Sequence, residues 1–184
     1  MKSIEITLPD KSVKVVSAGT TSSDIASSIG PRLADAVLVA RQNGVLRDLS
    51  HPITEDCDLE LLTGDTPDGH GVLLHSAAHL MAQAVKYFWP EAKLTIGPAV
   101  DNKFYYDFDI SINFTEEDLM KIEKKMKELS DKDYKCIRCE MSRNEAYKVF
   151  SEMGEDYKLE ILENISNDEL ITSYSQGDFI DLCR

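Results

Sequence analysis

Several features that would define a function class at once are missing from this chain of 184 residues. No apolar run approaches the roughly 20 residues that cross a bilayer, which excludes an integral membrane protein. The N-terminal MKSIEITLPD lacks the apolar stretch of a secretory signal. The four cysteines therefore indicate reduced thiols in a cytoplasmic protein rather than a disulfide framework. The pattern GxxxxGK[ST] is also absent, so the chain is not expected to hydrolyse nucleotides.

Basic residues are scarce. The chain has 20 Lys and Arg against 33 Asp and Glu, a net charge of −13. Proteins that bind nucleic acid by themselves contact phosphates with clustered Lys and Arg. Any nucleic acid that this chain meets is therefore expected to be held mainly by something else.

Residues 64–71, GDTPDGHG, are rich in Gly, Pro and Asp, which predicts a linker. It would separate a first domain, residues 1–63, from a second, residues 72–184. In the first domain we expect strands over 4–8, 13–15, 36–39 and 59–62, a turn at Asn43-Gly44, and one helix capped by Thr21 or Ser22 and stopped by Gly30-Pro31. The order ββαβ…β favours a β-grasp, ubiquitin-like sheet on one helix, with another small α+β domain as the alternative.

The second domain begins with apolar residues at helical spacing, which predict a long amphipathic helix from Val72 to about Phe88. Further expected elements are strands over 94–96, 104–108, 158–161 and 178–182, a helix opened by Thr115 with Leu119, Ile122, Met126 and Leu129 inward, and another opened by Ser142 and ending at Gly154. The predicted fold class is α+β: a small β-grasp domain followed by an α+β domain with a long N-terminal helix.

His75 and His79 are the sharpest local feature. At positions i and i+4 of a helix they project from one face, about 6 Å apart at Cβ, and can act on one metal, water or substrate. The glutamate of HExxH is absent, which disfavours a zinc protease. An HxxxH pair alone is often incidental.

The cysteines suggest less. Cys136 and Cys139 have CxxC spacing, but a structural zinc site needs four ligands and no second pair exists. Both are interpreted as structural thiols on an edge strand. In a strand near the end of the chain, Asp181 and Cys183 would share one face while Leu182 faces the core. Cys183 is then either a buried thiol or a thiol beside the histidine pair.

Several segments, in order along the chain, resemble the N-terminal region of threonyl-tRNA synthetases. They are Leu8-Pro9-Asp10, Ile29-Gly30, His75-Ser76-Ala77-Ala78-His79-Leu80, Phe88-Trp89-Pro90, Ile96-Gly97-Pro98, Asp101-Asn102, Phe104-Tyr105-Tyr106-Asp107, Tyr157-Lys158-Leu159-Glu160 and Asp181-Leu182-Cys183-Arg184. The resemblance implies a TGS domain over residues 1–63 and most of an editing domain over residues 72–184. Lys103 departs from the glycine usual in the family, so either the turn lies at Asn102 or the edge of the pocket has shifted.

In that family an aminoacylation core and an anticodon-binding domain follow, and Cys-Arg continues into Gly-Pro-His. We therefore expect an N-terminal fragment of a threonine–tRNA ligase with a C-terminally truncated editing domain. The ATP, magnesium and zinc of the parent enzyme, and its homodimer contacts, would belong to the absent domains. The fragment itself would need no cofactor.

Editing has a physical motive, because serine differs from threonine by one methyl group, worth only about 1–3 kcal/mol of discrimination. The implied reaction is hydrolysis of serine esterified to the 3′ end of threonine tRNA, whose acceptor end the fragment would bind weakly. The implied site consists of His75 and Lys158, which activate water and orient substrate, His79 and Cys183, which line the pocket, and Tyr106 and Asp181, which hold the amino acid or terminal adenosine.

Three alternatives stay open. His75, His79 and Cys183 could hold zinc with an open position. The chain could be a complete trans-editing hydrolase; slow or absent turnover by the chain alone is expected instead. It could also be a non-catalytic TGS-type regulatory module.

Overall fold

The computed structural model describes residues 2–166 and 168–183. The chain divides into two compact units between Leu74 and His75, and each is described by itself. Arg184, the last residue of one family-like segment, lies outside the described residues. Within the described ranges, no helix has the length and apolar character needed to cross a membrane.

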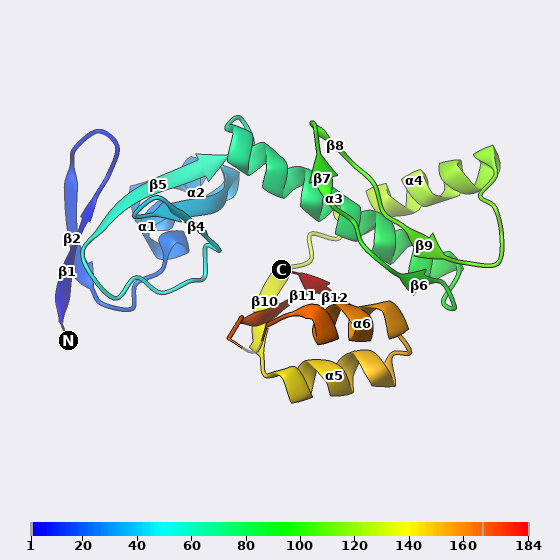
Figure 1. Ribbon diagram of the computed structural model, residues 1–184. Coiled ribbons are helices and arrows are strands. Elements are labelled where there is room, and N and C mark those ends of the chain that lie inside the picture. The colour runs from blue at the N-terminus through cyan, green and yellow to red at the C-terminus, as the bar shows by residue number, and fades with distance from the viewer. Residues whose placement is uncertain (1, 167, 184) are drawn as a thin grey trace. The chain divides into compact units, whose positions relative to one another are not determined.

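The first unit is a five-stranded sheet covered by a short helix (Figure 1). Its elements are β1 (Ser3–Thr7), β2 (Val13–Ser17), α1 (Ser22–Ile29), α2 (Pro31–Ala36), β3 (Val37–Gln42), β4 (Val45–Arg47) and β5 (Cys57–Thr63). The strand order is β2-β1-β5-β3-β4, with β1 and β5 parallel. This is the predicted β-grasp fold, with α2 as an addition that the sequence analysis did not expect.

Local sequence explains these elements. Thr21 and Asp24 form a reciprocal capping box at the start of α1, which satisfies backbone donors that the first helical turn leaves unpaired. Asn43 and Gly44 both have positive φ, as the tight turn between β3 and β4 requires. The core consists of Ile4, Ile6, Ile25, Ala40, Ile53, Cys57 and Leu59.

The second hairpin strand shows what alternation leaves undecided. Val13 and Val15 do lie on one face of β2, but that face is exposed. In the antiparallel register Ile4 pairs with Val16, so Val16 shares the core-facing side and packs on the core. The partner strand therefore decides which face is buried.

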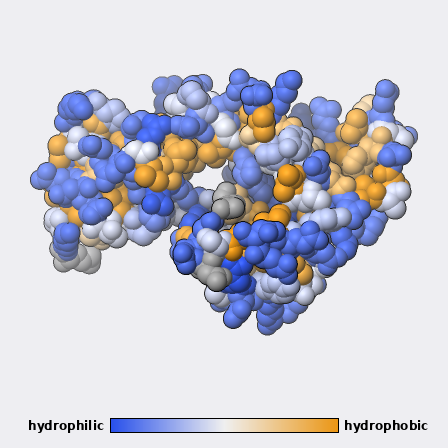
Figure 2. Space-filling view, in the orientation of Figure 1, coloured by the Kyte–Doolittle hydropathy of each residue, from blue (hydrophilic) through white to orange (hydrophobic). Residues whose placement is uncertain are grey.

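The second unit combines helices with small sheets. Its elements are α3 (Pro67–Phe88, which begins in the first unit), β6 (Lys93–Leu94), β7 (Ala99–Val100), β8 (Lys103–Phe104), β9 (Phe108–Asp109), α4 (Glu116–Ser130), β10 (Cys136–Met141), α5 (Arg143–Glu152), α6 (Asp156–Asn164), β11 (Ile171–Gln176) and β12 (Phe179–Cys183). The strands β10, β11 and β12 form an antiparallel sheet, with α5 and α6 side by side next to it (Figure 1). The surface of α5 and α6 that faces the viewer is mostly hydrophilic (Figure 2).

The predicted linker is partly helical. Helix α3 begins at Pro67 rather than Val72, because Thr66 accepts a hydrogen bond from the Gly69 amide through its hydroxyl and Pro67 occupies the first helical position. The loop prediction is wrong from residue 67 onward. The Gly, Pro and Asp content of residues 64–71 indicates a loop, but Thr66 and Pro67 are also residue types that begin a helix.

Two other expectations fail. Residues 158–161 lie in helix α6 rather than a strand, because four alternating residues do not distinguish a strand from a helix whose Lys158 and Leu162 face inward one turn apart. Leu119 is exposed, whereas Ile122 and Leu129 of α4 are buried as predicted. The capping boxes that open α4 and α5 are confirmed.

The turn near Lys103 is resolved. Positive φ falls on Asp101 and Asn102, and Lys103 itself lies in β8, paired with Val100. The left-handed conformation thus falls on an aspartate and an asparagine, residue types that tolerate it.

Candidate active site

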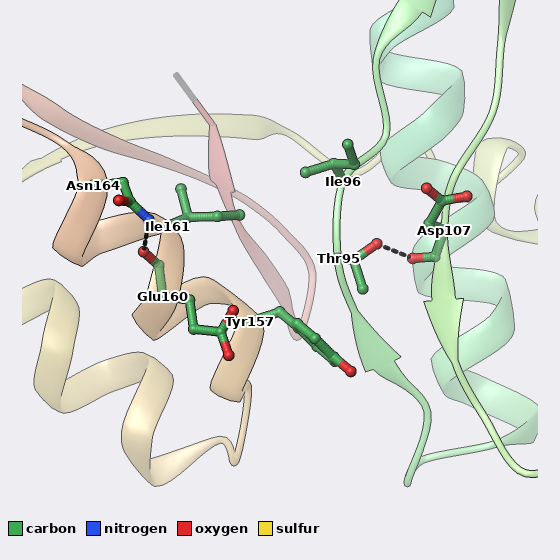
Figure 3. A pocket seen from close by; sticks show the side chains of 7 residues that line it. All are labelled: Thr95, Ile96, Asp107, Tyr157, Glu160, Ile161 and Asn164. Carbon is green, nitrogen blue, oxygen red and sulfur yellow. Dashed lines mark hydrogen bonds between the residues drawn. The ribbon is translucent and has the colours of Figure 1, made fainter.

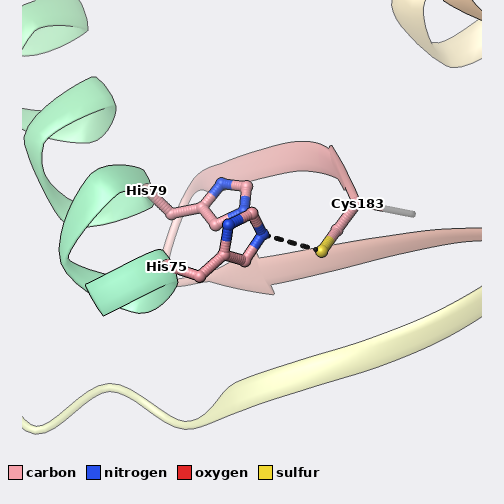
Figure 4. A group of neighbouring side chains, drawn as sticks. All are labelled: His75, His79 and Cys183. Carbon is pink, nitrogen blue, oxygen red and sulfur yellow. Dashed lines mark hydrogen bonds between the residues drawn. The ribbon is translucent and has the colours of Figure 1, made fainter. Parts of the chain in front are cut away.

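The two histidines of helix α3 face each other one turn apart. His75 Nε2 lies 3.0 Å from His79 Nε2, and the rings meet edge to face with centroids 4.6 Å apart. Strand β12 brings Cys183 to the same point, with its Sγ 3.2 Å from His75 Nε2 (Figure 4). Residues separated by 108 positions in the sequence therefore form one cluster.

Strand alternation places Asp181 beside that cysteine. Leu182 packs into the core under the sheet, so Asp181 and Cys183 point to the opposite face. Asp181 is almost wholly buried, and its Oδ2 accepts a hydrogen bond from His79 Nδ1 at 2.9 Å. The carboxylate thus orients the ring whose other nitrogen faces His75.

Lys158 and Tyr106 complete the network around the same carboxylate. The Lys158 ammonium lies 2.8 Å from Asp181 Oδ1 and donates to the Tyr106 hydroxyl at 3.0 Å and to the Thr95 carbonyl at 2.9 Å. The Tyr106 hydroxyl donates to Asp181 Oδ2 at 2.6 Å. Because each polar group has partners, burying this ion pair does not leave an isolated charge.

Gly97 is needed for close packing in this network. A Cβ atom at that position would overlap the Tyr106 ring. The glycine of the Ile96-Gly97-Pro98 segment therefore lets the backbone approach the ring, which holds the tyrosine hydroxyl against Asp181.

The electrostatics favour a neutral His75 and a protonated Cys183. Burial, followed by the charge of His79, lowers the pKa of His75 below its usual 6.5. Burial raises the pKa of Cys183 to about 11, although Lys158 and Arg138 oppose that rise. At neutral pH the imidazole offers a lone pair, and the sulfur remains a thiol.

Asp181 stays ionised in spite of its burial. Burial by itself raises the pKa of this carboxyl, but the hydrogen bond from His79 and the charge of Lys158 outweigh it, and the net pKa lies below the usual value. Burial, with Asp181 nearby, raises the pKa of Tyr106. The tyrosine therefore acts as a hydrogen-bond donor rather than a base.

Three of these residues also have the chemistry of metal ligands. Ligand atoms of His75, His79 and Cys183 all lie within 4.8 Å of one another. Two imidazoles and one thiolate would suit zinc. Among the described residues the CxxC cysteines join no such group: Cys136 and Cys139 are exposed on β10, an edge strand, as predicted.

A pocket of about 320 Å³ lies between α6 and the segments of residues 95–96 and 107, lined by Thr95, Ile96, Asp107, Tyr157, Glu160, Ile161 and Asn164 (Figure 3). None of the six predicted site residues lines it. Lys158 points inward from the same helix, while Tyr157 and Glu160 border the pocket. The two carboxylates of this pocket make it unfavourable for a phosphate.

A second ion pair, around the buried carboxylate of Glu155, supports the site and was not indicated by any sequence pattern. Glu155 is almost wholly buried just before α6; its carboxylate lies 2.7 Å from Lys86 Nζ and accepts from the Leu94 amide at 2.8 Å. It ties the start of α6, and with it Lys158, to α3 and β6. A glutamate after a glycine carries no pattern that could have revealed this.

Fold and site together define a β-grasp domain followed by a unit with a helical histidine pair. Residues 4–63 match the family model of the TGS domain, which confirms the first predicted domain type.

The particular relatives are threonine–tRNA ligases. The chain is 51% identical over 179 residues to the ligase of Alkalilimnicola ehrlichii, covering 97% of this chain and 28% of that protein. It is 47% identical over 184 residues to the ligase of Geobacter sp. strain M21, covering 100% and 29%, and 46% identical over 180 residues to that of Acetivibrio thermocellus, covering 98% and 28%. The predicted resemblance to the N-terminal region of these enzymes is thus confirmed, and the chain spans less than a third of their length.

Proposed function

We propose that the second unit hydrolyses the ester of serine mischarged on threonine tRNA, as the editing part of a threonine–tRNA ligase. The observation that carries the proposal is one connected network. Cys183 contacts His75, His75 contacts His79, and His79 and Lys158 both contact the buried carboxylate of Asp181. The similarity to threonine–tRNA ligases supports tRNA as the partner.

Ester hydrolysis needs a base for water and a positive charge for the developing oxyanion. The neutral His75 imidazole, with a lowered pKa, suits the first role. The Lys158 ammonium, held by Asp181, suits the second. Water attacks directly in this mechanism, because the Cys183 thiol, with its pKa of about 11, is a poor nucleophile at neutral pH.

The proposed reaction uses no metal. The mechanism uses the His75 lone pair as the base, and zinc on His75, His79 and Cys183 would occupy that lone pair; the purified chain is therefore expected to contain less than stoichiometric metal. Elemental analysis checks this: one zinc per chain, lost in His75→Ala but kept in a Cys136→Ser/Cys139→Ser double variant, would contradict the metal-free mechanism.

The substrate is tested by incubating the 184-residue chain with seryl- and threonyl-tRNA of threonine specificity. Slow hydrolysis of the serine ester above the uncatalysed rate is expected, because the net charge of −13 opposes RNA binding. The threonine ester should be spared. Binding of a non-hydrolysable 3′-serylamino-adenosine, followed by the His75 and His79 imidazole NMR signals, gives a second readout. No excess hydrolysis together with unmoved signals would overturn the proposal.

A further inference from the structure

Arg138 lies on the same face of the β10-β11-β12 sheet as the site residues of β12. The register pairs Arg138 with Tyr174 on β11, and Tyr174 with Asp181 on β12. Directly paired residues share a face, and two strand spacings separate the Cα atoms of Arg138 and Asp181 by about 10 Å. The arginine therefore stands beside the network around Asp181 rather than within it.

The guanidinium is held in place by a neighbour two residues along the strand. Arg138 Nη1 donates to Glu140 Oε1 at 2.7 Å, and the arginine side chain is 18% exposed against 50% for the glutamate. The charge of Arg138 also acts at the Cys183 sulfur. A pre-positioned cation thus borders the site, paired with a carboxylate that is free to turn toward solvent.

The charges that border the network around Asp181 differ between its α6 side and its β10 side. The pocket shown in Figure 3 contains the carboxylates of Asp107 and Glu160, which repel phosphate. The Lys158 ammonium is buried beside Asp181, where a backbone phosphate of the strand cannot reach it. The β10 side carries the Arg138 cation, whose partner Glu140 is the more exposed of the two side chains.

We propose that Arg138 binds a backbone phosphate of the RNA strand whose 3′ ester enters the site, and that Glu140 holds the guanidinium in the free protein. This inference rests on the proposed function. A planar guanidinium matches two phosphate oxygens with parallel hydrogen bonds. Arg138 is thus a substrate-binding residue that does not touch the ester.

The test compares two serine esters, one on tRNA and one on adenosine without any phosphate. Arg138→Gln is expected to raise KM for the tRNA ester about tenfold, the loss of one charged hydrogen-bonded contact, with kcat unchanged. It should reduce the salt slope of binding by about 1 and leave the adenosine ester unaffected. Arg138→Lys should retain the salt slope.

Glu140 supplies a matched variant with the opposite sign. Glu140→Gln removes the carboxylate partner of the guanidinium and is expected to lower KM for the tRNA ester, whereas Arg138→Gln/Glu140→Gln should behave as Arg138→Gln alone. Equal effects on both esters, a fall in kcat, or unchanged KM and salt slope in Arg138→Gln would overturn the inference.

Failure of the proposed function is recognised separately: a wild-type chain that hydrolyses neither ester, and whose His75 and His79 signals are unmoved by 3′-serylamino-adenosine, contradicts it. In that case binding of tRNA ending in a non-hydrolysable 3′-serylamino group, measured by fluorescence anisotropy, tests Arg138 directly. Weaker binding and a smaller salt slope in Arg138→Gln support the phosphate contact. Identical binding by wild type and variant contradicts it.

Discussion

The two units bury different kinds of side chain. The interior of the β-grasp unit is one apolar cluster, with Ser22 as its buried polar residue among those described. The second unit divides its apolar residues over three smaller clusters and buries Glu155, Lys158, Ser173 and Asp181 as well. Buried charges contribute little net stability against apolar residues of similar volume. The comparison indicates that the first unit is held by apolar burial, whereas the second also keeps buried charges, which the proposed hydrolysis would use.

Asp181→Ala is expected to have the largest effect on stability, and only in the second unit. The change leaves the Lys158 ammonium buried without its counter-ion, so the second unit is expected to lose about 3–5 kcal/mol of stability. The first unit should be unaffected, since Asp181 has no role in its core. Amide hydrogen exchange, read separately over residues 2–74 and 75–183, measures both effects. An equal loss in the two units would contradict the division.

Ile6→Ala is the matched change in the first unit. Ile6 is wholly buried in the apolar cluster, and its truncation should cost that unit about 2–5 kcal/mol. Exchange in the second unit and hydrolysis of a serine ester on adenosine should stay at wild-type values. If ester hydrolysis falls with Ile6→Ala, the chemistry is not confined to the second unit.

A smaller effect is expected from Gly97→Ala. The added methyl group overlaps the Tyr106 ring, and such overpacking costs about 1–3 kcal/mol. Gly64→Ala is a suitable control, because a Cβ there makes only ordinary contacts with Leu38 and Leu73. Exchange protection of the second unit should fall in the first variant alone; equal protection in both variants would show that the ring moves aside freely.

The contacts that these variants test also show which parts of the fold and of the site are predictable from the sequence. Contacts set by local pattern were predictable: the histidine pair on one helix face, Cys183 beside Asp181 on one strand face, and the capping boxes. The position of Lys158 in the site was not predictable. The alternation over residues 158–161 favours a strand rather than helix α6, and the partners of Lys158, Thr95 and Tyr106, come from distant segments. Only the family resemblance pointed to Lys158. No sequence pattern indicates a role for Arg138, which lies inside the CxxC spacing of Cys136 and Cys139.

The pH dependence of hydrolysis tests the role of His75 separately from the stability of either unit. His75 accepts a proton only while neutral, so hydrolysis should rise with pH and level off, with a midpoint below 6.5 because the pKa of His75 is lowered. The rate is lost as pH falls through that midpoint. A pH profile of kcat on the adenosine ester, corrected for uncatalysed hydrolysis, measures it. A midpoint above 6.5 would assign the titration to another group.

Whether His75 is the base of the proposed hydrolysis is decided by comparing rates for two histidines of helix α3. Deacylation of seryl-tRNA is measured for the wild-type chain, for His75→Ala, and for His70→Ala, which removes a histidine outside the cluster. We predict that His75→Ala lowers the rate by about 10²–10⁴-fold or to the uncatalysed background, and that His70→Ala matches wild type. Equal rates in wild type and His75→Ala would contradict the account.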